Sequence, residues 1–88
     1  MTVTVRLPGL LDRYTGGLRE TEVEATTLAG AVAALDARWP GLAFRLVDEQ
    51  DRIRTHINMF VDGEQVRTLD APLSAGGEVF VIGSLSGG

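Results

Sequence analysis

The sequence contains no cysteine among its 88 residues. Disulfide bonds, zinc–thiolate sites and thiol nucleophiles are therefore excluded, and any sulfur chemistry must use sulfur supplied by another molecule. Lysine is also absent, and all 8 residues counted as Lys or Arg are arginine. An activated C-terminus would then meet no lysine amine on its own molecule, although the arginine and alanine bias of a genome explains this absence equally well.

The sequence also lacks any apolar run long enough to cross a bilayer, and residues 1–5 lack the basic and apolar regions of a secretion signal. We therefore expect a cytoplasmic protein that has no membrane partner. Its 12 acidic residues outnumber the arginines and give a formal charge of −4. Because no basic cluster is present to neutralise phosphates, we expect no nucleic-acid partner, and the acidic balance favours a basic protein surface.

Catalytic motifs are missing as well. The one histidine, His56, has no serine and carboxylate at a spacing that indicates a triad. The pairs Gly16-Gly17 and Gly76-Gly77 lack the following Lys-Ser/Thr of a phosphate-binding loop. A row of alternating carboxylates marks the solvent side of an edge strand more readily than a metal site: Glu20, Glu22 and Glu24. We expect neither a metal site nor an enzyme.

Alternating apolar and polar residues predict strands with one buried face. The five predicted strands cover residues 2–7, 18–25, 53–61, 64–67 and 78–82. Gly16-Gly17 is a turn signal between the first two strands. Asp62-Gly63 predicts a type I′ hairpin, because both central positions of that turn need positive φ.

One main helix is predicted between the second and third strands. Its apolar positions recur every three or four residues and end near Arg38: Leu28, Val32, Leu35 and Trp39. Thr26 or Thr27 supplies the N-cap, and Pro40 ends the helix. Residues 42–47 form either an irregular segment or a short helix. The expected fold is α+β, with a mixed sheet of about five strands packed on one main helix.

The last five residues, 84–88, follow directly on the final apolar strand and end in Gly87 and Gly88. Because glycine has no Cβ, such an end can thread into the narrow active site of a partner and present its carboxylate there. We therefore expect a folded domain over residues 1–83, a flexible tail over residues 84–88, and the Gly88 carboxylate as the reactive group.

Phe60 is the second candidate for a functional residue. If Met59 and Val61 point into the core, Phe60 lies on the open face of the sheet, where Phe80 or Ile82 would join it in an apolar docking patch. The alternative is that the segment 42–47 covers Phe60. Both readings remain open from the sequence.

The order strand, strand, helix, strand, strand, strand, followed by Gly-Gly, resembles the ubiquitin-like β-grasp sulfur carriers of the MoaD/ThiS type over the whole chain. The loop that ends at Gly17 and the segment 61–67 look most like the actinobacterial CysO branch. The tail departs from the family, because it has no proline shortly before its glycines. The other segments that carry the resemblance are residues 3–5, 31–40, 57–63 and 76–79.

This resemblance implies a carrier mechanism. An adenylyltransferase of the ubiquitin-activating type, similar to MoeB, would use ATP to convert the Gly88 carboxylate to an acyl-adenylate. Sulfide or a partner's persulfide would then displace AMP and leave a thiocarboxylate. Gly87 would give clearance, Ser86 and Leu85 would contact the partner, and the carrier itself would bind no cofactor.

Three readings of the chain remain, and two of them specify where the sulfur goes. The CysO-like reading implies a pyridoxal-phosphate cysteine synthase as acceptor and a zinc metallopeptidase that releases cysteine from Gly88. The second reading is the small subunit of molybdopterin synthase, whose tail enters the large subunit. In the third, the chain is a β-grasp interaction module and its Gly-Gly is accidental.

Overall fold

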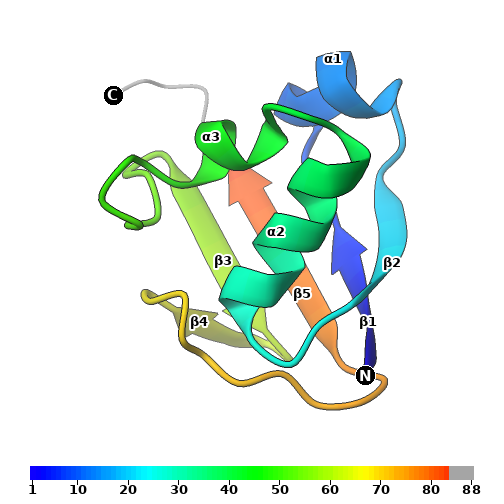
Figure 1. Ribbon diagram of the computed structural model, residues 1–88, viewed down its shortest axis with the longest axis vertical. Helices are drawn as coiled ribbons and strands as arrows, with labels where there is room; N and C mark the ends of the chain where they lie inside the picture. The colour runs from blue at the N-terminus through cyan, green and yellow to red at the C-terminus, as the bar shows by residue number, and fades with distance from the viewer. Residues whose placement is uncertain (84–88) are drawn as a thin grey trace.

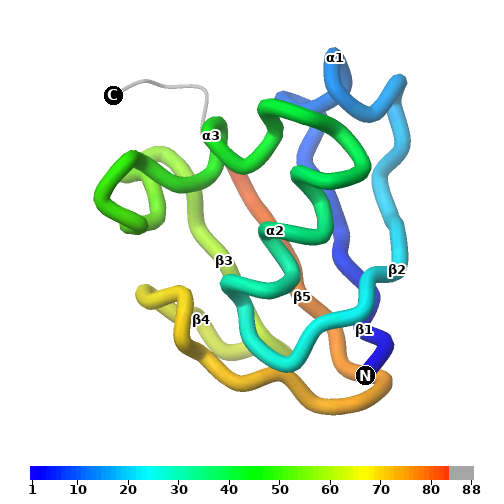
Figure 2. The backbone as a smooth tube through the Cα atoms, viewed as in Figure 1, coloured from blue at the N-terminus to red at the C-terminus, as the bar shows by residue number. Residues whose placement is uncertain are grey.

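A computed structural model describes residues 1–83 as one mixed sheet covered on one face by helices (Figure 1). Its strands lie in the order β2-β1-β5-β3-β4. Figure 2 shows the first and last strands, β1 and β5, side by side in the middle of this sheet. The strand bounds are β1 Thr2–Arg6, β2 Glu20–Glu24, β3 Ile57–Val61, β4 Glu64–Val66 and β5 Glu78–Gly83.

The helices are η1 Gly9–Leu11, α1 Asp12–Thr15, α2 Leu28–Arg38 and α3 Leu42–Leu46. The longest, α2, crosses the sheet, and α3 lies beside it on the same face (Figure 1). A mixed sheet in this order with one main helix across it is the β-grasp arrangement that the sequence predicts. Among residues 1–83, no helix is both long and apolar enough to span a membrane.

The alternation in the first two strands is confirmed. Val3 and Val5 of β1 are buried, as are Thr21 and Val23 of β2. The three glutamates between the buried positions of β2 are exposed, and β2 lies at the edge of the sheet. The carboxylate row therefore faces solvent on an edge strand, where charge discourages pairing with another chain.

The predicted main helix is also confirmed, with Thr27 rather than Thr26 as its N-cap. The Thr27 hydroxyl accepts a hydrogen bond from the Gly30 amide at 3.2 Å, which satisfies one of the free amides of the first turn. The buried face of α2 points at the sheet, and burial of one such leucine contributes roughly 1.5–3 kcal/mol. That face consists of Leu28, Ala31, Val32 and Leu35.

The connection between β1 and β2 differs from the expected simple turn, because it contains η1 and α1. Leu11 at the end of η1 is fully buried, so the helical turns bring an apolar side chain into the core that an extended loop would leave in solvent. The chain leaves α1 through Gly16, whose φ of 70° is left-handed, a conformation that glycine adopts without steric cost.

The predicted type I′ turn forms between β3 and β4, with φ of 49° at Asp62 and 89° at Gly63. The Asp62 carboxylate accepts a hydrogen bond from the Glu78 amide at 2.8 Å. The hairpin turn therefore holds the first residue of β5. Residues 42–47 are mostly a short helix, α3, whose Leu42 and Leu46 are fully buried.

Gly83 at the end of β5 allows a close approach by Leu10. A Cβ at Gly83 would lie 1.8 Å from Cδ2 of Leu10, which is far inside van der Waals contact. We expect Gly83→Ala to lower the free energy of unfolding by about 1 kcal/mol, the low end of the usual cost of overpacking, because the partly exposed Leu10 side chain can turn away. In a Leu10→Ala background, the same change should cost much less. Urea unfolding of the four proteins checks this, and an equal cost in both backgrounds would contradict it.

Candidate functional site

The last strand, β5, delivers residues 84–88 from the centre of the sheet. It pairs with β1 in parallel and with β3 in antiparallel register, in which Ile57 lies opposite Gly83. The fold thus fixes the point at which the predicted tail begins. The predicted site residues Leu85, Ser86, Gly87 and Gly88 lie outside the described residues, so their roles stay predictions.

Phe60 lies on the open face of the sheet, opposite the helices. Its register partner across β3 and β5 is Phe80, which is 45% exposed, and Ile82 on the same face is 41% exposed. Phe80 and Ile82 therefore both lie on the same face of the sheet as Phe60. We call these three residues, Phe60, Phe80 and Ile82, the open-face patch.

The alternative in which residues 42–47 cover Phe60 is wrong. Leu42 and Leu46 of that segment pack in the core with Met59, and Met59 points to the opposite side of the sheet from Phe60 because strand side chains alternate. Phe60 is half-buried by its neighbours in the sheet and does not pack on the core. Whether the open-face patch binds a partner stays a prediction.

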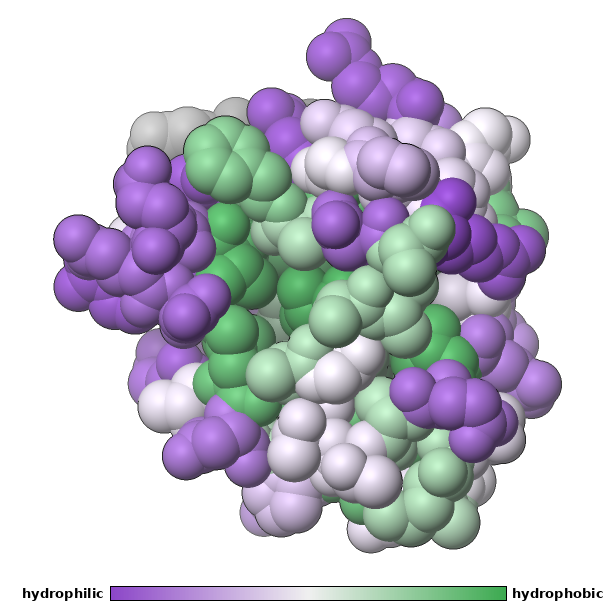
Figure 3. Space-filling view, in the orientation of Figure 1, coloured by the Kyte–Doolittle hydropathy of each residue, from purple (hydrophilic) through white to green (hydrophobic). Residues whose placement is uncertain are grey.

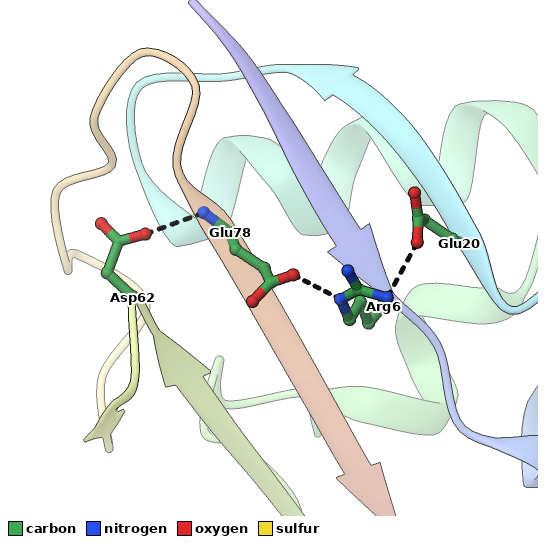
Figure 4. Close-up of polar contacts among 4 residues, drawn as sticks. All are labelled: Arg6, Glu20, Asp62 and Glu78. Carbon is green, nitrogen blue, oxygen red and sulfur yellow. Dashed lines mark hydrogen bonds and ion pairs between the residues drawn. The ribbon is translucent and has the colours of Figure 1, made fainter.

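A polar row lies next to the open-face patch. Arg6, the register partner of Phe80, donates hydrogen bonds to Glu78 on one neighbouring strand and to Glu20 on the other (Figure 4). The hydrogen bond and charge of Glu78, followed by the charge of Glu20, raise the pKa of Arg6. The row therefore links β5, β1 and β2 across the open face and leaves the β2 side of that face acidic.

A groove of about 570 Å³ lies on the other face of the molecule, between α2, α3 and the loop that follows α3. In Figure 3 apolar side chains surround this hollow. Asp36 and Asp48 line it, but both carboxylates hold backbone amides. Asp36 accepts hydrogen bonds from Gly41 and Ala43.

Asp48 accepts hydrogen bonds from the amides of Arg52 and Gln50, at 3.0 and 2.9 Å. These hydrogen bonds lower the pKa of its carboxyl group, because they favour the charged form. A carboxylate whose pKa is lowered is a weaker base, so Asp48 is suited to holding the loop and not to proton transfer. Both carboxylates therefore serve the local backbone, and neither is a candidate reactive group in the groove.

His56 is half-buried and lines two shallow depressions with Arg54. No serine lines either depression, so no triad forms there within residues 1–83. The same described residues contain no group of three or more metal-ligating side chains.

The sequence reading missed Phe44, which is 61% exposed on α3. The signal was present, because Phe44 lies midway between Leu42 and Leu46. Two core residues separated by four positions define the buried side of a helix, and a residue halfway between them points away from it.

Comparison with known proteins agrees with this fold. Residues 5–88 match the ThiS family model. The sulfur carrier protein CysO of Mycobacterium tuberculosis is 30% identical over 93 residues, which cover all of both chains. The expectation of a non-enzymatic protein is consistent with that relative's name.

Two solved structures are similar over nearly the whole chain. In the crystal structure of the Amycolatopsis orientalis BexX/CysO complex, the matching chain has a TM-score of 0.88 at 29% identity, over 98% of this chain and 99% of that one. The crystal structure of Mycobacterium tuberculosis CysO has a TM-score of 0.87 at 26% identity, over 94% of this chain and 99% of that one.

Proposed function

Because the chain belongs to the ThiS family, we propose that it is a sulfur carrier protein whose Gly88 carboxyl group is adenylated and then converted to a thiocarboxylate. The observation that carries this proposal is the match over residues 5–88, which includes the Gly87-Gly88 end. The full-length similarity to a protein named as a sulfur carrier supports it.

The chemistry has two balanced steps. A Gly88 carboxylate oxygen attacks the α-phosphorus of ATP, and pyrophosphate leaves. Hydrosulfide then attacks the acyl carbon, AMP leaves with that oxygen, and a thiocarboxylate remains after loss of a proton. A persulfide donor would instead give an acyl disulfide, which a second thiol must cleave. Adenylation is needed because a free carboxylate has no good leaving group.

The partner supplies the catalysis in this scheme. ATP binding, phosphoryl chemistry and sulfur delivery belong to an adenylyltransferase of the MoeB-like type, and the carrier provides a reactive end on a folded platform. Gly87 gives the clearance that a narrow channel requires, and Ser86 and Leu85 contact its walls. Because activation consumes ATP, we place the protein in the cytoplasm.

The open-face patch is the surface that we assign to the adenylyltransferase. Phe80 and Ile82 belong to β5, the strand that leads into the tail, so a partner seated on them is positioned to receive Gly88. Exposed aromatic and apolar side chains on a sheet are typical of docking surfaces. The acidic side of this face, along β2, favours a partner with basic residues next to its apolar contact.

For the fate of the sulfur we propose cysteine synthesis, as in the CysO-like reading. The thiocarboxylate sulfur would add to an aminoacrylate held on a pyridoxal-phosphate cysteine synthase, and a zinc metallopeptidase would release cysteine from Gly88. The similarity to two CysO proteins supports this fate over transfer to molybdopterin.

Loading is tested by intact-mass measurement after incubation with ATP, sulfide and the cognate adenylyltransferase. We expect the mass to rise by the difference between one sulfur and one oxygen. Deletion of Gly88 should abolish this rise and leave the thermal unfolding midpoint unchanged, because residues 1–83 contain the core. An unchanged wild-type mass, under conditions that load a control carrier, would overturn the proposed function.

Phe60→Ala tests the open-face patch. We expect it to weaken adenylyltransferase binding about tenfold, a loss typical of an aromatic contact residue. Thr4→Ala, on the same face but beyond the patch, is the matched control and should bind as the wild type does. Calorimetric titration measures binding and urea unfolding measures stability. A large loss of stability with unchanged affinity would assign Phe60 to the fold.

A further inference from the structure

The fold gathers basic side chains that are dispersed in the sequence. Arg45 of α3, together with Arg54 and His56 from the loop before β3, lines a depression of about 270 Å³ that also includes Phe44 and Glu49. The sequence alone predicted no basic cluster. This one forms because α3 and that loop pack next to each other at one end of the sheet.

Within this cluster, Arg54 is held over the ring of Phe44. The central guanidinium carbon of Arg54 lies 4.5 Å from the centre of the Phe44 ring, and its Nε donates a hydrogen bond to the Phe44 carbonyl oxygen at 2.7 Å. Stacking and the hydrogen bond together fix the orientation of an otherwise mobile side chain. We call the pair Phe44 and Arg54 the platform.

Only Nε of Arg54 takes part in the hydrogen bond to Phe44, so its two terminal nitrogens can still donate to a partner. No carboxylate forms an ion pair with Arg54 or Arg45 among the residues that the structure describes. Asp48, on the loop that follows α3, forms its ion pair with Arg52, although the charge of Arg54 also contributes to the lowered pKa of Asp48. The two terminal nitrogens of Arg54 thus present a planar fork, the geometry that matches a carboxylate with two parallel hydrogen bonds.

The platform lies next to the point where the tail begins. Gly83 is the register partner of Ile57. Arg54 precedes Ile57 by only three positions, and its backbone carbonyl oxygen accepts a hydrogen bond from the Ile57 amide at 2.9 Å. In Figure 1 the end of β5 and α3 lie at the same end of the molecule. Because α3 covers the helix face and the patch lies on the open face, the platform and the open-face patch lie on opposite sides of the sheet near the end of β5.

We propose that the platform is a second contact site for the adenylyltransferase, which presents a carboxylate to the Arg54 guanidinium. This inference rests on the proposed function. Contacts on both sides of β5 fix the direction in which the tail leaves the fold, so that Gly88 approaches ATP from a defined orientation. Phe44 acts by holding Arg54 in place and by direct apolar contact.

The test is the kinetics of adenylation, measured by ATP–pyrophosphate exchange with the carrier as varied substrate. Arg54→Gln and Phe44→Ala should each raise KM for the carrier about tenfold with kcat unchanged, as expected for the loss of one oriented charged contact. Arg54→Lys should fall between the wild type and Arg54→Gln. Arg13→Gln, which removes the same charge from exposed α1, should behave as the wild type.

Salt gives an independent readout. The KM of the wild type should rise with ionic strength more steeply than that of Arg54→Gln, because the variant has lost a charged contact. The thermal unfolding midpoint of each variant should equal that of the wild type. A change in KM then reports a change in docking and not a loss of folded protein.

The possible outcomes separate the two proposals. If the wild type is adenylated and Arg54→Gln has the KM of Arg13→Gln, the platform is not a contact site and the proposed function stands. A rise in KM for ATP alone would assign Arg54 to the nucleotide and also overturn the platform. If the wild type is not adenylated at all, both the platform and the proposed function are wrong.

Discussion

The pairing of β5 between β1 and β3 is the constraint on which the other features depend. Val79 and Val81 of this strand are almost fully buried, and ladder hydrogen bonds hold it on both sides. The position of the chain at Gly83 is therefore fixed by the buried strand before it and by its pairing with Ile57 of β3. Under the proposed function, the Gly88 carboxyl group can therefore reach a partner without any rearrangement of the fold.

An enzyme both folds into a stable scaffold and catalyses a reaction, whereas under the proposed function this domain supplies only the scaffold. In the folded domain, Asp48 holds a loop and Asp62 holds a hairpin through hydrogen bonds to backbone amides. Under the proposed function, the partner enzyme then supplies the catalysis. The acidic and basic side chains also gather in different regions of the domain. The acidic row lies along β2, while the basic cluster lies on α3 and the loop before β3, so one partner can place groups of opposite charge against the two regions.

Local patterns predicted most of the fold. Strand alternation, the Thr27 cap and the Asp62-Gly63 turn each depend on residues within a few positions of one another. The features that were missed depend on packing between distant segments. The turns of η1 form because Leu11 reaches the core, and Arg54 meets Phe44 only once α3 has folded against the loop before β3. Phe60 could be placed on a strand, but only the assembled sheet showed that α3 leaves it uncovered.

The most direct measurement of the proposed chemistry follows one oxygen atom. A carrier whose Gly88 carboxylate is labelled with oxygen-18 by peptide ligation is incubated with ATP, sulfide and the adenylyltransferase, and the released AMP is analysed by mass spectrometry. If the carboxylate attacks the α-phosphorus, the AMP carries one labelled oxygen and the carrier retains the other. Unlabelled AMP alongside a sulfur-loaded carrier would show that sulfur enters by another route and would contradict activation at Gly88.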